Sequence, residues 1–277
     1  MEARQRSQKD NEPIPQPNTK PKRCLTLRIN QVPLDLAHES FENDLKSIAI
    51  QDFVLHEAVN TLNHLTLVRM NKHSSCATAT FHTSLSNDEL VRRIQIASDS
   101  RPYKFDSDFY GITPIYDHEN DTHADLVAVP GLGSHALGSC KSSISNEIWL
   151  RDYLPYDTPN QRVIIYGHNT RLQGAQSKQS IGDLGARFME TITRFRADTG
   201  TSQRPIIFIG HSLGGLLIKE ALIRSLNTSR SNIHKACYGM LFFGVPNLGL
   251  RNDQLLTIAQ GEPNQALIES LVVDRDS

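Results

Sequence analysis

Hydrophobic and polar positions follow two different patterns along this chain of 277 residues, and the pattern changes near residue 120. Before that point, short segments alternate between strand-like and helix-like spacing. After it, compact apolar runs end in turn residues and are separated by longer helical stretches. The two patterns predict a tail at 1–23, a small domain at 24–117 and a larger α/β domain at 124–277.

The tail at 1–23 is polar and rich in proline, so we expect it to be disordered. It lacks the apolar core of a secretory signal peptide. No apolar run in the chain reaches the ~20 residues that a membrane-spanning helix needs. We therefore expect an intracellular chain without a transmembrane segment, for which peripheral membrane contact remains open.

The region 24–117 has the order β-α-β-β-α-β, which is typical of a ferredoxin-like α+β domain. Strand-like alternation is found in CLTLRI, HLTLVRM and CATATF, and one further strand is expected between Tyr103 and Tyr116. Helical spacing is found in SFENDLKSI and in SNDELVRRI, where Ser86 is a candidate N-cap.

RNA-recognition motifs share this order of elements, so RNA binding is an alternative for the small domain. Such motifs stack bases on aromatic side chains of their two central strands. The matching strands offer Leu27, Ile29, Ala77 and Ala79, and Phe81 is their one aromatic residue. The pattern therefore favours a packing or adaptor role, and no nucleic-acid partner is expected.

The region from 124 onward contains four compact apolar runs, DLVAVPGL, QRVIIYGHN, RPIIFIGHS and YGMLFFGV. Runs of this kind suit strands that are buried on both faces, as in parallel sheets. Helical stretches at 181–196 and 215–226 lie between them. The alternation predicts a doubly wound, mostly parallel sheet.

Composition adds little to this picture. The formal net charge is −1, which gives no general attraction to nucleic acid or to anionic membranes. The four cysteines are far apart and form no C-x-x-C pair, so neither a zinc site nor a disulfide scaffold is indicated. We predict no cofactor and no metal.

The sequence Gly210-His211-Ser212-Leu213-Gly214 lies between a predicted strand and a predicted helix. This is the G-x-S-x-G nucleophile elbow in its expected setting. The tight turn strains the serine backbone and leaves no room for side chains two residues away on either side. Ser212 is therefore the predicted nucleophile. His211 is predicted to be part of the turn and not to act as the catalytic base.

A second glycine-rich turn, Pro130-Gly131-Leu132-Gly133, follows the first apolar run of the larger domain. Serine hydrolases of this type hold the oxyanion with two backbone amides, one after the serine and one in the loop after an earlier strand. The predicted donors are Leu213 and Leu132, with Gly133 as the next candidate. A plain β-α turn would also explain the segment.

Four stretches, DLVAVPGLGSHA, IWLRDYLPYDTPNQRVIIYGHNT, IFIGHSLGGLLIKEAL and MLFFGVPNLGL, resemble the lipase-like, serine-active-site-containing family of the α/β-hydrolase superfamily. The resemblance is strongest to fungal members that precede NACHT or ankyrin-repeat regions. It implies an α/β-hydrolase fold for 124–277. Two residues depart from the family: Pro130 stands where histidine is common before the oxyanion glycine, and Asn247 stands where many members have histidine.

The chain order in α/β hydrolases is serine, acid, histidine. After Ser212 we identify one more strand and one helical stretch, so we expect a truncated domain whose acid and histidine lie beyond Ser277. His234 is the one histidine after Ser212, and it precedes a strand. Asp253 could serve as an acid in a variant layout. As given, the chain is expected to be a poor esterase, and an extended chain a competent one.

Two functional hypotheses follow. The first is an acyl-ester hydrolase of lipase or esterase type that uses Ser212. The second is a non-catalytic interaction or signalling module built on the hydrolase fold, with protein partners bound through the small domain. The resemblance also implies lipid substrates and association with mitochondrial or endoplasmic-reticulum membranes.

Overall fold

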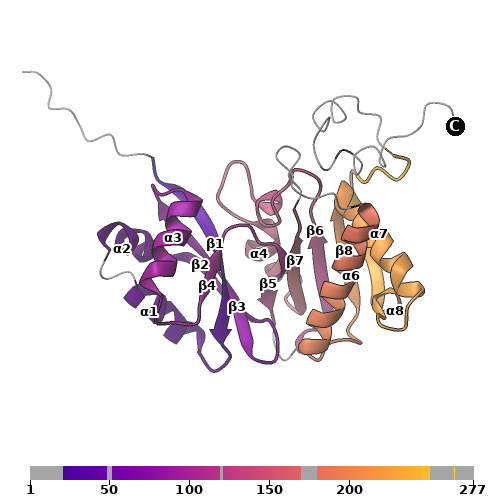
Figure 1. The fold of residues 1–277 in the computed structure, drawn as a ribbon, viewed down its shortest axis with the longest axis horizontal. Coiled ribbons are helices and arrows are strands. Elements are labelled where there is room, and N and C mark those ends of the chain that lie inside the picture. Colours follow the sequence, from indigo (N-terminus) through magenta and orange to yellow (C-terminus); the bar gives the residue numbers. More distant parts are fainter. Residues whose placement is uncertain (1–20, 49–51, 119–120, 170–179, 250–264, 266–277) are drawn as a thin grey trace, which may run out of the picture.

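The computed structural model describes residues 21–48, 52–118, 121–169, 180–249 and 265. Their strands form two sheets that lie side by side, the first drawn in indigo to magenta (Figure 1). Most of the predicted tail, residues 1–20, lies outside the described residues. The first strand begins at Arg23.

The first sheet has four antiparallel strands in the order β2-β3-β1-β4. Its elements are β1 (Arg23–Pro33), α1 (His38–Ile48), α2 (Phe53–Asn60), β2 (Asn63–Arg69), β3 (Ser74–Thr83), α3 (Asn87–Ala97) and β4 (Lys104–Asp106). This is the ferredoxin-like arrangement with one helix, α2, that the hydrophobic pattern did not predict. We call it the N-terminal module.

Side-chain hydrogen bonds cap the N-termini of two of these helices. The Asp52 carboxylate accepts from the amides of Val54 and Leu55 at the start of α2. The Ser86 hydroxyl accepts from the Glu89 amide at the start of α3, which confirms the predicted cap.

The helices of the N-terminal module cover one face of its sheet. Leu27 and Ile29 of β1 and Ala79 of β3 are completely buried in the same core as Phe41 of α1 and Leu90 of α3. The residues that were compared with base-stacking positions therefore face the helices, and the opposite face carries Thr26, Thr78 and Thr80 instead.

That opposite face packs against the second sheet. Thr78 is 0 % and Thr80 3 % exposed. The Arg28 guanidinium donates through Nη1 to the Tyr110 carbonyl oxygen (2.7 Å) and to Thr113 Oγ1 (3.0 Å). Arg151, from the part of the chain that carries the second sheet, donates a hydrogen bond to Thr80 Oγ1 of the first sheet (3.0 Å). The open face of the ferredoxin-like sheet is thus an internal interface of this molecule.

The sequence predicted one strand between Tyr103 and Tyr116, but the structure has two strands in this region. Strand β4 joins the first sheet, whereas β5 (Gly111–Asp117) pairs antiparallel with β7 in the second. Positive φ angles at Phe109 (57°) and Gly111 (80°) turn the chain between them. Strand pairing therefore divides the chain near residue 108, and the ranges 24–117 and 124–277 remain predictions as domain boundaries.

The second sheet has the order β5-β7-β6-β8-β9, in which all pairs except β5 with β7 are parallel. The remaining elements are β6 (Ala124–Val129), η2 (Gly138–Cys140), α4 (Trp149–Asp152), α5 (Leu154–Asp157), β7 (Gln161–Gly167), α6 (Ile181–Asp198), β8 (Ile206–His211), α7 (Leu213–Leu226), α8 (Ile233–Ala236) and β9 (Cys237–Phe243). The doubly wound, mostly parallel sheet of an α/β-hydrolase-type fold is confirmed. We call this part the hydrolase module.

Both faces of the second sheet are covered. Val127 and Phe208 pack against Phe188 of α6 and Leu217 of α7 on one face. On the other face, Leu126 and Ile165 pack against the segment that contains Leu137, Ile148 and Leu150. Alternate residues of the same strands thus enter two separate cores, which explains why the runs are apolar throughout.

Strand β9 is the edge of this sheet among the described residues. Tyr238 is 81 % exposed, and Leu241 and Phe243 are about half exposed at 51 % and 54 %. The described sheet therefore ends on an apolar strand. None of the described helices has the length and apolar character needed to cross a bilayer.

Candidate active site

Ser212 lies at the junction between β8 and α7. Its backbone has φ 51° and ψ −124°, a conformation that costs free energy for any residue with a side chain. The Ser212 amide donates to the Phe243 carbonyl (2.9 Å), and the Ser212 carbonyl accepts from the Gly215 amide (3.1 Å). These bonds to β9 and α7 hold the strained turn in place.

The glycines around Ser212 are required by packing. An added Cβ would lie 2.7 Å from the Gly215 Cα if placed on Gly210, and 2.2 Å from the Val129 carbonyl oxygen if placed on Gly214. A Cβ on Gly215 would lie 2.3 Å from Val245. The first turn of α7 is thus packed directly on its neighbours, as the elbow motif predicts.

The loop after β6 passes directly against the serine. A Cβ on Gly131 would lie 2.8 Å from the Ser212 Cβ and 3.1 Å from His211 Nδ1. Leu132 follows Gly131 and packs against the core beneath α6 and α7. Leu213 is the first residue of α7, where backbone amides are free of helical partners. The roles of the Leu132 and Leu213 amides remain predictions.

A cavity of about 480 Å³ opens beside the elbow. His211 borders it and is exposed. The lining is largely apolar and consists of Ala128, Val129, Pro130, Ser134, Ala136, Ser139, Cys140, Trp149, Leu150, Ile209, His211 and Phe243. Burial raises the pKa of the Cys140 thiol to about 12, so this cysteine is protonated and is not a competing nucleophile.

Two histidines of the hydrolase module are engaged elsewhere. His135 Nδ1 accepts from the Gly138 amide (2.9 Å), and its Nε2 lies 2.7 Å from the Ser107 carbonyl oxygen, to which it donates. His234 Nδ1 lies 2.8 Å from Ser225 Oγ, just before β9 begins. Since Cys237 pairs with Ile206 at the start of β8, His234 is at the edge of the sheet opposite Ser212.

His168 follows β7 at the same edge of the sheet as the elbow. It is 7 % exposed, its ring stacks on the Tyr166 ring with 5.9 Å between the ring centroids, and neither ring nitrogen has a hydrogen-bond partner among the described residues. Burial lowers its pKa to about 4. Strand β6 separates β7 from β8, so His168 is not adjacent to Ser212.

Within the described ranges, no histidine is hydrogen-bonded to the Ser212 hydroxyl. Asn247, at the position where the resembled family often has histidine, accepts a hydrogen bond from Lys219. Asp253 lies outside the described residues. The four cysteines are free thiols, and the described residues include no cluster of three or more metal-ligating side chains.

Residues 126–271, more than half of the chain and including the elbow, match the family model described as "Putative serine esterase (DUF676)". This chain belongs to that serine esterase family. The match begins in β6, so it includes the loop at Gly131 as well as Ser212.

Curated relatives of the serine esterase chain are similar in sequence. Protein SERAC1 of Danio rerio is 32 % identical over 108 residues, which cover 37 % of this chain and 16 % of that protein. Protein SERAC1 of Homo sapiens is 25 % identical over 214 residues, which cover 70 % of this chain and 33 % of that protein. The chain thus spans a third or less of the length of these relatives.

Solved structures show a weaker likeness. The type II thioesterase YbtT of a yersiniabactin pathway is 18 % identical with a TM-score of 0.37, covering 60 % of this chain and 59 % of that one. Esterase 2 of Thermogutta terrifontis is 14 % identical with a TM-score of 0.31, covering 58 % and 60 %. At these values the likeness says nothing about activity.

Proposed function

We propose that this serine esterase family member hydrolyses acyl esters, with Ser212 as the nucleophile and the amides of Leu213 and Leu132 as oxyanion donors. The observation that carries the proposal is the strained Ser212 backbone at the start of α7, with Gly131 directly against it. A strained backbone conformation persists when the surrounding structure holds it in place, and such conformations cluster at active sites.

In the proposed reaction, Ser212 Oγ forms a bond to the ester carbonyl carbon as its proton passes to a base. The carbonyl oxygen becomes an oxyanion beside the two amides. The alcohol then leaves with a proton, and water hydrolyses the acyl-enzyme. The base and its acid come from outside the described residues, and their location beyond Ser277 remains a prediction.

The apolar cavity beside the elbow favours an ester with an apolar acyl group. Trp149, Leu150 and Phe243 offer apolar surface close to the loop that contains Pro130. The family resemblance extends this proposal to lipid esters and to peripheral association with mitochondrial or endoplasmic-reticulum membranes.

A non-catalytic interaction or signalling module is the second candidate. This candidate is favoured because three histidines of the hydrolase module are not placed to act as the base for Ser212. His135 and His234 have other hydrogen-bond partners, and His168 is buried. The resemblance to fungal proteins with NACHT or ankyrin-repeat regions supports the same candidate. Protein partners would then bind the N-terminal module.

Hydrolysis of p-nitrophenyl butyrate separates the two candidates. We expect slow turnover that Ser212→Ala lowers to the buffer rate and that Ser47→Ala, on the distant helix α1, leaves unchanged. Turnover that survives in Ser212→Ala would show that Ser212 is not the nucleophile. A folded chain with no turnover, even when extended past Ser277, would favour the interaction module.

A further inference from the structure

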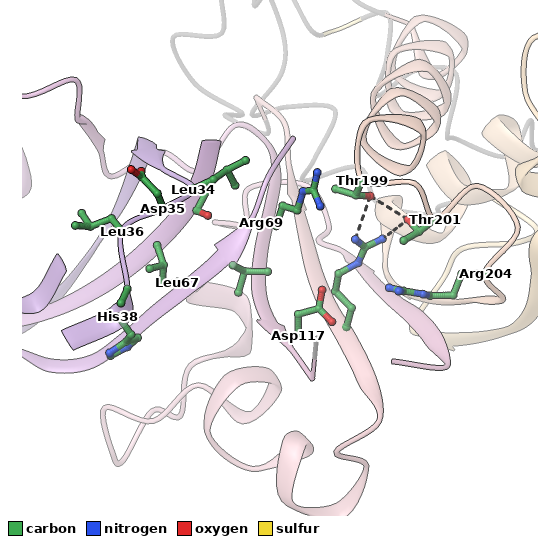
Figure 2. Close-up of a pocket in the computed structure, with 14 residues that line it drawn as sticks. Leu34, Asp35, Leu36, His38, Leu67, Arg69, Asp117, Thr199, Thr201 and Arg204 are labelled. Carbon is green, nitrogen blue, oxygen red and sulfur yellow. Dashed lines mark hydrogen bonds between the residues drawn. The ribbon is translucent and has the colours of Figure 1, made fainter. Parts of the chain in front are cut away.

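A second cavity, of about 720 Å³, lies between the two modules (Figure 2). Arg162, at the start of β7, lines it, and so does Asp117, at the end of the antiparallel strand β5. The parallel strands of the hydrolase module begin at this edge, whereas Ser212 follows the end of β8. The cavity is therefore at the edge of the sheet opposite the elbow.

The lining divides into two chemically different ends. One end in Figure 2 is formed by three leucines of the N-terminal module, Leu34, Leu36 and Leu67, together with Asp35 and His38. Opposite them in Figure 2 are the guanidinium groups of Arg69 and Arg204 and the hydroxyl groups of Thr199 and Thr201, which accept hydrogen bonds from Arg162. A ligand that fills this space would meet the leucines beside Asp35 at one end and cationic donors at the other.

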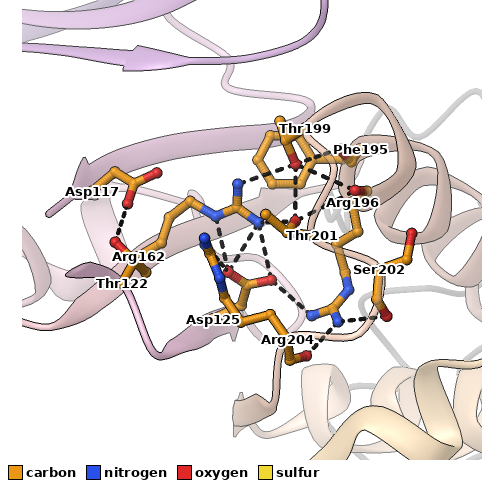
Figure 3. Close-up of polar contacts among 10 residues, drawn as sticks. All are labelled: Asp117, Thr122, Asp125, Arg162, Phe195, Arg196, Thr199, Thr201, Ser202 and Arg204. Carbon is orange, nitrogen blue, oxygen red and sulfur yellow. Dashed lines mark hydrogen bonds and ion pairs between the residues drawn. The ribbon is translucent and has the colours of Figure 1, made fainter. Parts of the chain in front are cut away.

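The arginines at the cationic end belong to a cluster around one buried carboxylate, Asp125 (Figure 3). Asp125 is 0 % exposed and accepts from Arg162 Nε (2.9 Å) and Nη2 (3.0 Å). Arg196 Nη1 donates to it at 2.7 Å and Arg204 Nη1 at 3.2 Å. Three guanidinium groups thus share one carboxylate.

Positive charge therefore exceeds negative charge at this end. Burial lowers the pKa of Arg196 to about 10, which still leaves its guanidinium protonated at neutral pH. With Arg69 included, four guanidinium groups face two carboxylates, Asp125 and Asp117, and Asp117 also accepts from Thr122. Asp35, at the other end of the cavity, reduces the excess over the whole cavity to one positive charge, which an anionic ligand would neutralise.

The cluster leaves donors for such a ligand. Arg204 contacts Asp125 through Nη1 alone among its described partners, and its side chain is 18 % exposed. Arg69 is exposed and donates through Nε to the Asn71 carbonyl (3.2 Å), so its Nη1 and Nη2 groups can turn toward the cavity. Guanidinium groups form strong, often bidentate hydrogen bonds with phosphate oxygens.

We propose that this interdomain cavity binds an amphipathic phosphate monoester. Its phosphate head lies against Arg69 and Arg204, and its apolar body lies against the leucines of the N-terminal module. The volume is within the range of small-molecule sites, roughly 300–1,000 Å³. Because both modules line the cavity, the ligand fixes one module against the other, independently of chemistry at Ser212.

Isothermal titration calorimetry of the 277-residue chain with octyl phosphate tests the proposal. We expect saturable binding that is stronger than that of inorganic phosphate and absent for octanol. Arg69→Gln and Arg204→Gln should each weaken binding of octyl phosphate by at least about tenfold. Leu36→Ser should weaken octyl phosphate but leave inorganic phosphate unchanged.

Two matched variants locate the site. Arg224→Gln alters an arginine of α7 that pairs with Glu220 at 2.6 Å, and it should bind octyl phosphate as the wild type does. Ser212→Ala should also bind normally, because the elbow is at the other edge of the sheet. All variants are first compared by thermal melting to establish that they fold.

Failure of octyl phosphate to bind the folded wild-type chain would overturn the proposal. So would binding that neither Arg69→Gln nor Arg204→Gln weakens, or binding that Ser212→Ala abolishes, since the ligand would then occupy another surface or the elbow.

Discussion

A Cβ atom on Gly214 would lie 2.2 Å from the carbonyl oxygen of Val129, so the first turn of α7 rests directly on the end of β6. Gly214→Ala should therefore force these elements apart and lower the free energy of unfolding by about 3 kcal/mol. Urea unfolding measures the change. Gly239→Ala is the control, because a Cβ there meets nothing within 4 Å, and an equal loss in both variants would contradict the packing argument.

Asp125→Asn should be among the most destabilising single substitutions in the hydrolase module. It leaves Arg162 and Arg196, 2 % and 1 % exposed, without their buried counter-charge. Removal of one partner from a buried ion pair costs about 3–5 kcal/mol. Glu220→Gln, which breaks a partly exposed pair with Arg224, should change the free energy of unfolding by less than about 0.5 kcal/mol. Equal effects in urea unfolding would be evidence against the cluster.

His168 should make the chain less stable in mild acid. Its pKa is about 4 in the folded protein, below the ordinary value of about 6.5, so the unfolded chain takes up the proton first as pH falls. Protonation of His168 does not affect the free energy of unfolding above about pH 6.5. Between pH 6.5 and pH 4 it lowers the free energy of unfolding progressively, and the total loss at pH 4 is about 3 kcal/mol.

The free energy of unfolding at several pH values measures this effect. His168→Phe should flatten the dependence between pH 6.5 and 4, and His73→Gln, which alters an exposed histidine, should keep it. An unchanged dependence in His168→Phe would show that other groups cause it.

The elbow could be located from sequence because its cause is local. The apolar strand before Gly210, the tight turn at Ser212 and the apolar helix after it lie within about one β-turn-α unit of the chain. The same locality made the Ser86 cap predictable. Whether Ser212 acts as a nucleophile depends on groups brought from other parts of the chain, which no local pattern reveals.

The division between the sheets was missed for the opposite reason. Phe105 and Ile112 both look like residues of one apolar strand, yet they enter different sheets. The polar run Asp106-Ser107-Asp108 followed by Gly111 is a turn signal that could have separated them. The number of residues between the two strands does not fix which sheet each one joins.

The Asp125 cluster was also missed. Asp125 and Arg162 stand at the starts of two apolar runs, where they look like solvated flanking residues. Adjacent parallel strands bring such positions together, so charges at the starts of neighbouring buried strands are a usable signal. The contribution of Arg196, 71 residues away from Asp125, depends on tertiary packing.

Mass spectrometry of the 277-residue chain after reaction with a fluorophosphonate ester tests the central claim most directly. The Ser212 oxygen should bond to phosphorus as fluoride leaves, so the adduct should map to the peptide with Ser212. It should be missing in Ser212→Ala and present in Ser47→Ala. A folded wild-type chain that carries no adduct at Ser212, or that is modified equally in the Ser212→Ala variant, would contradict the account.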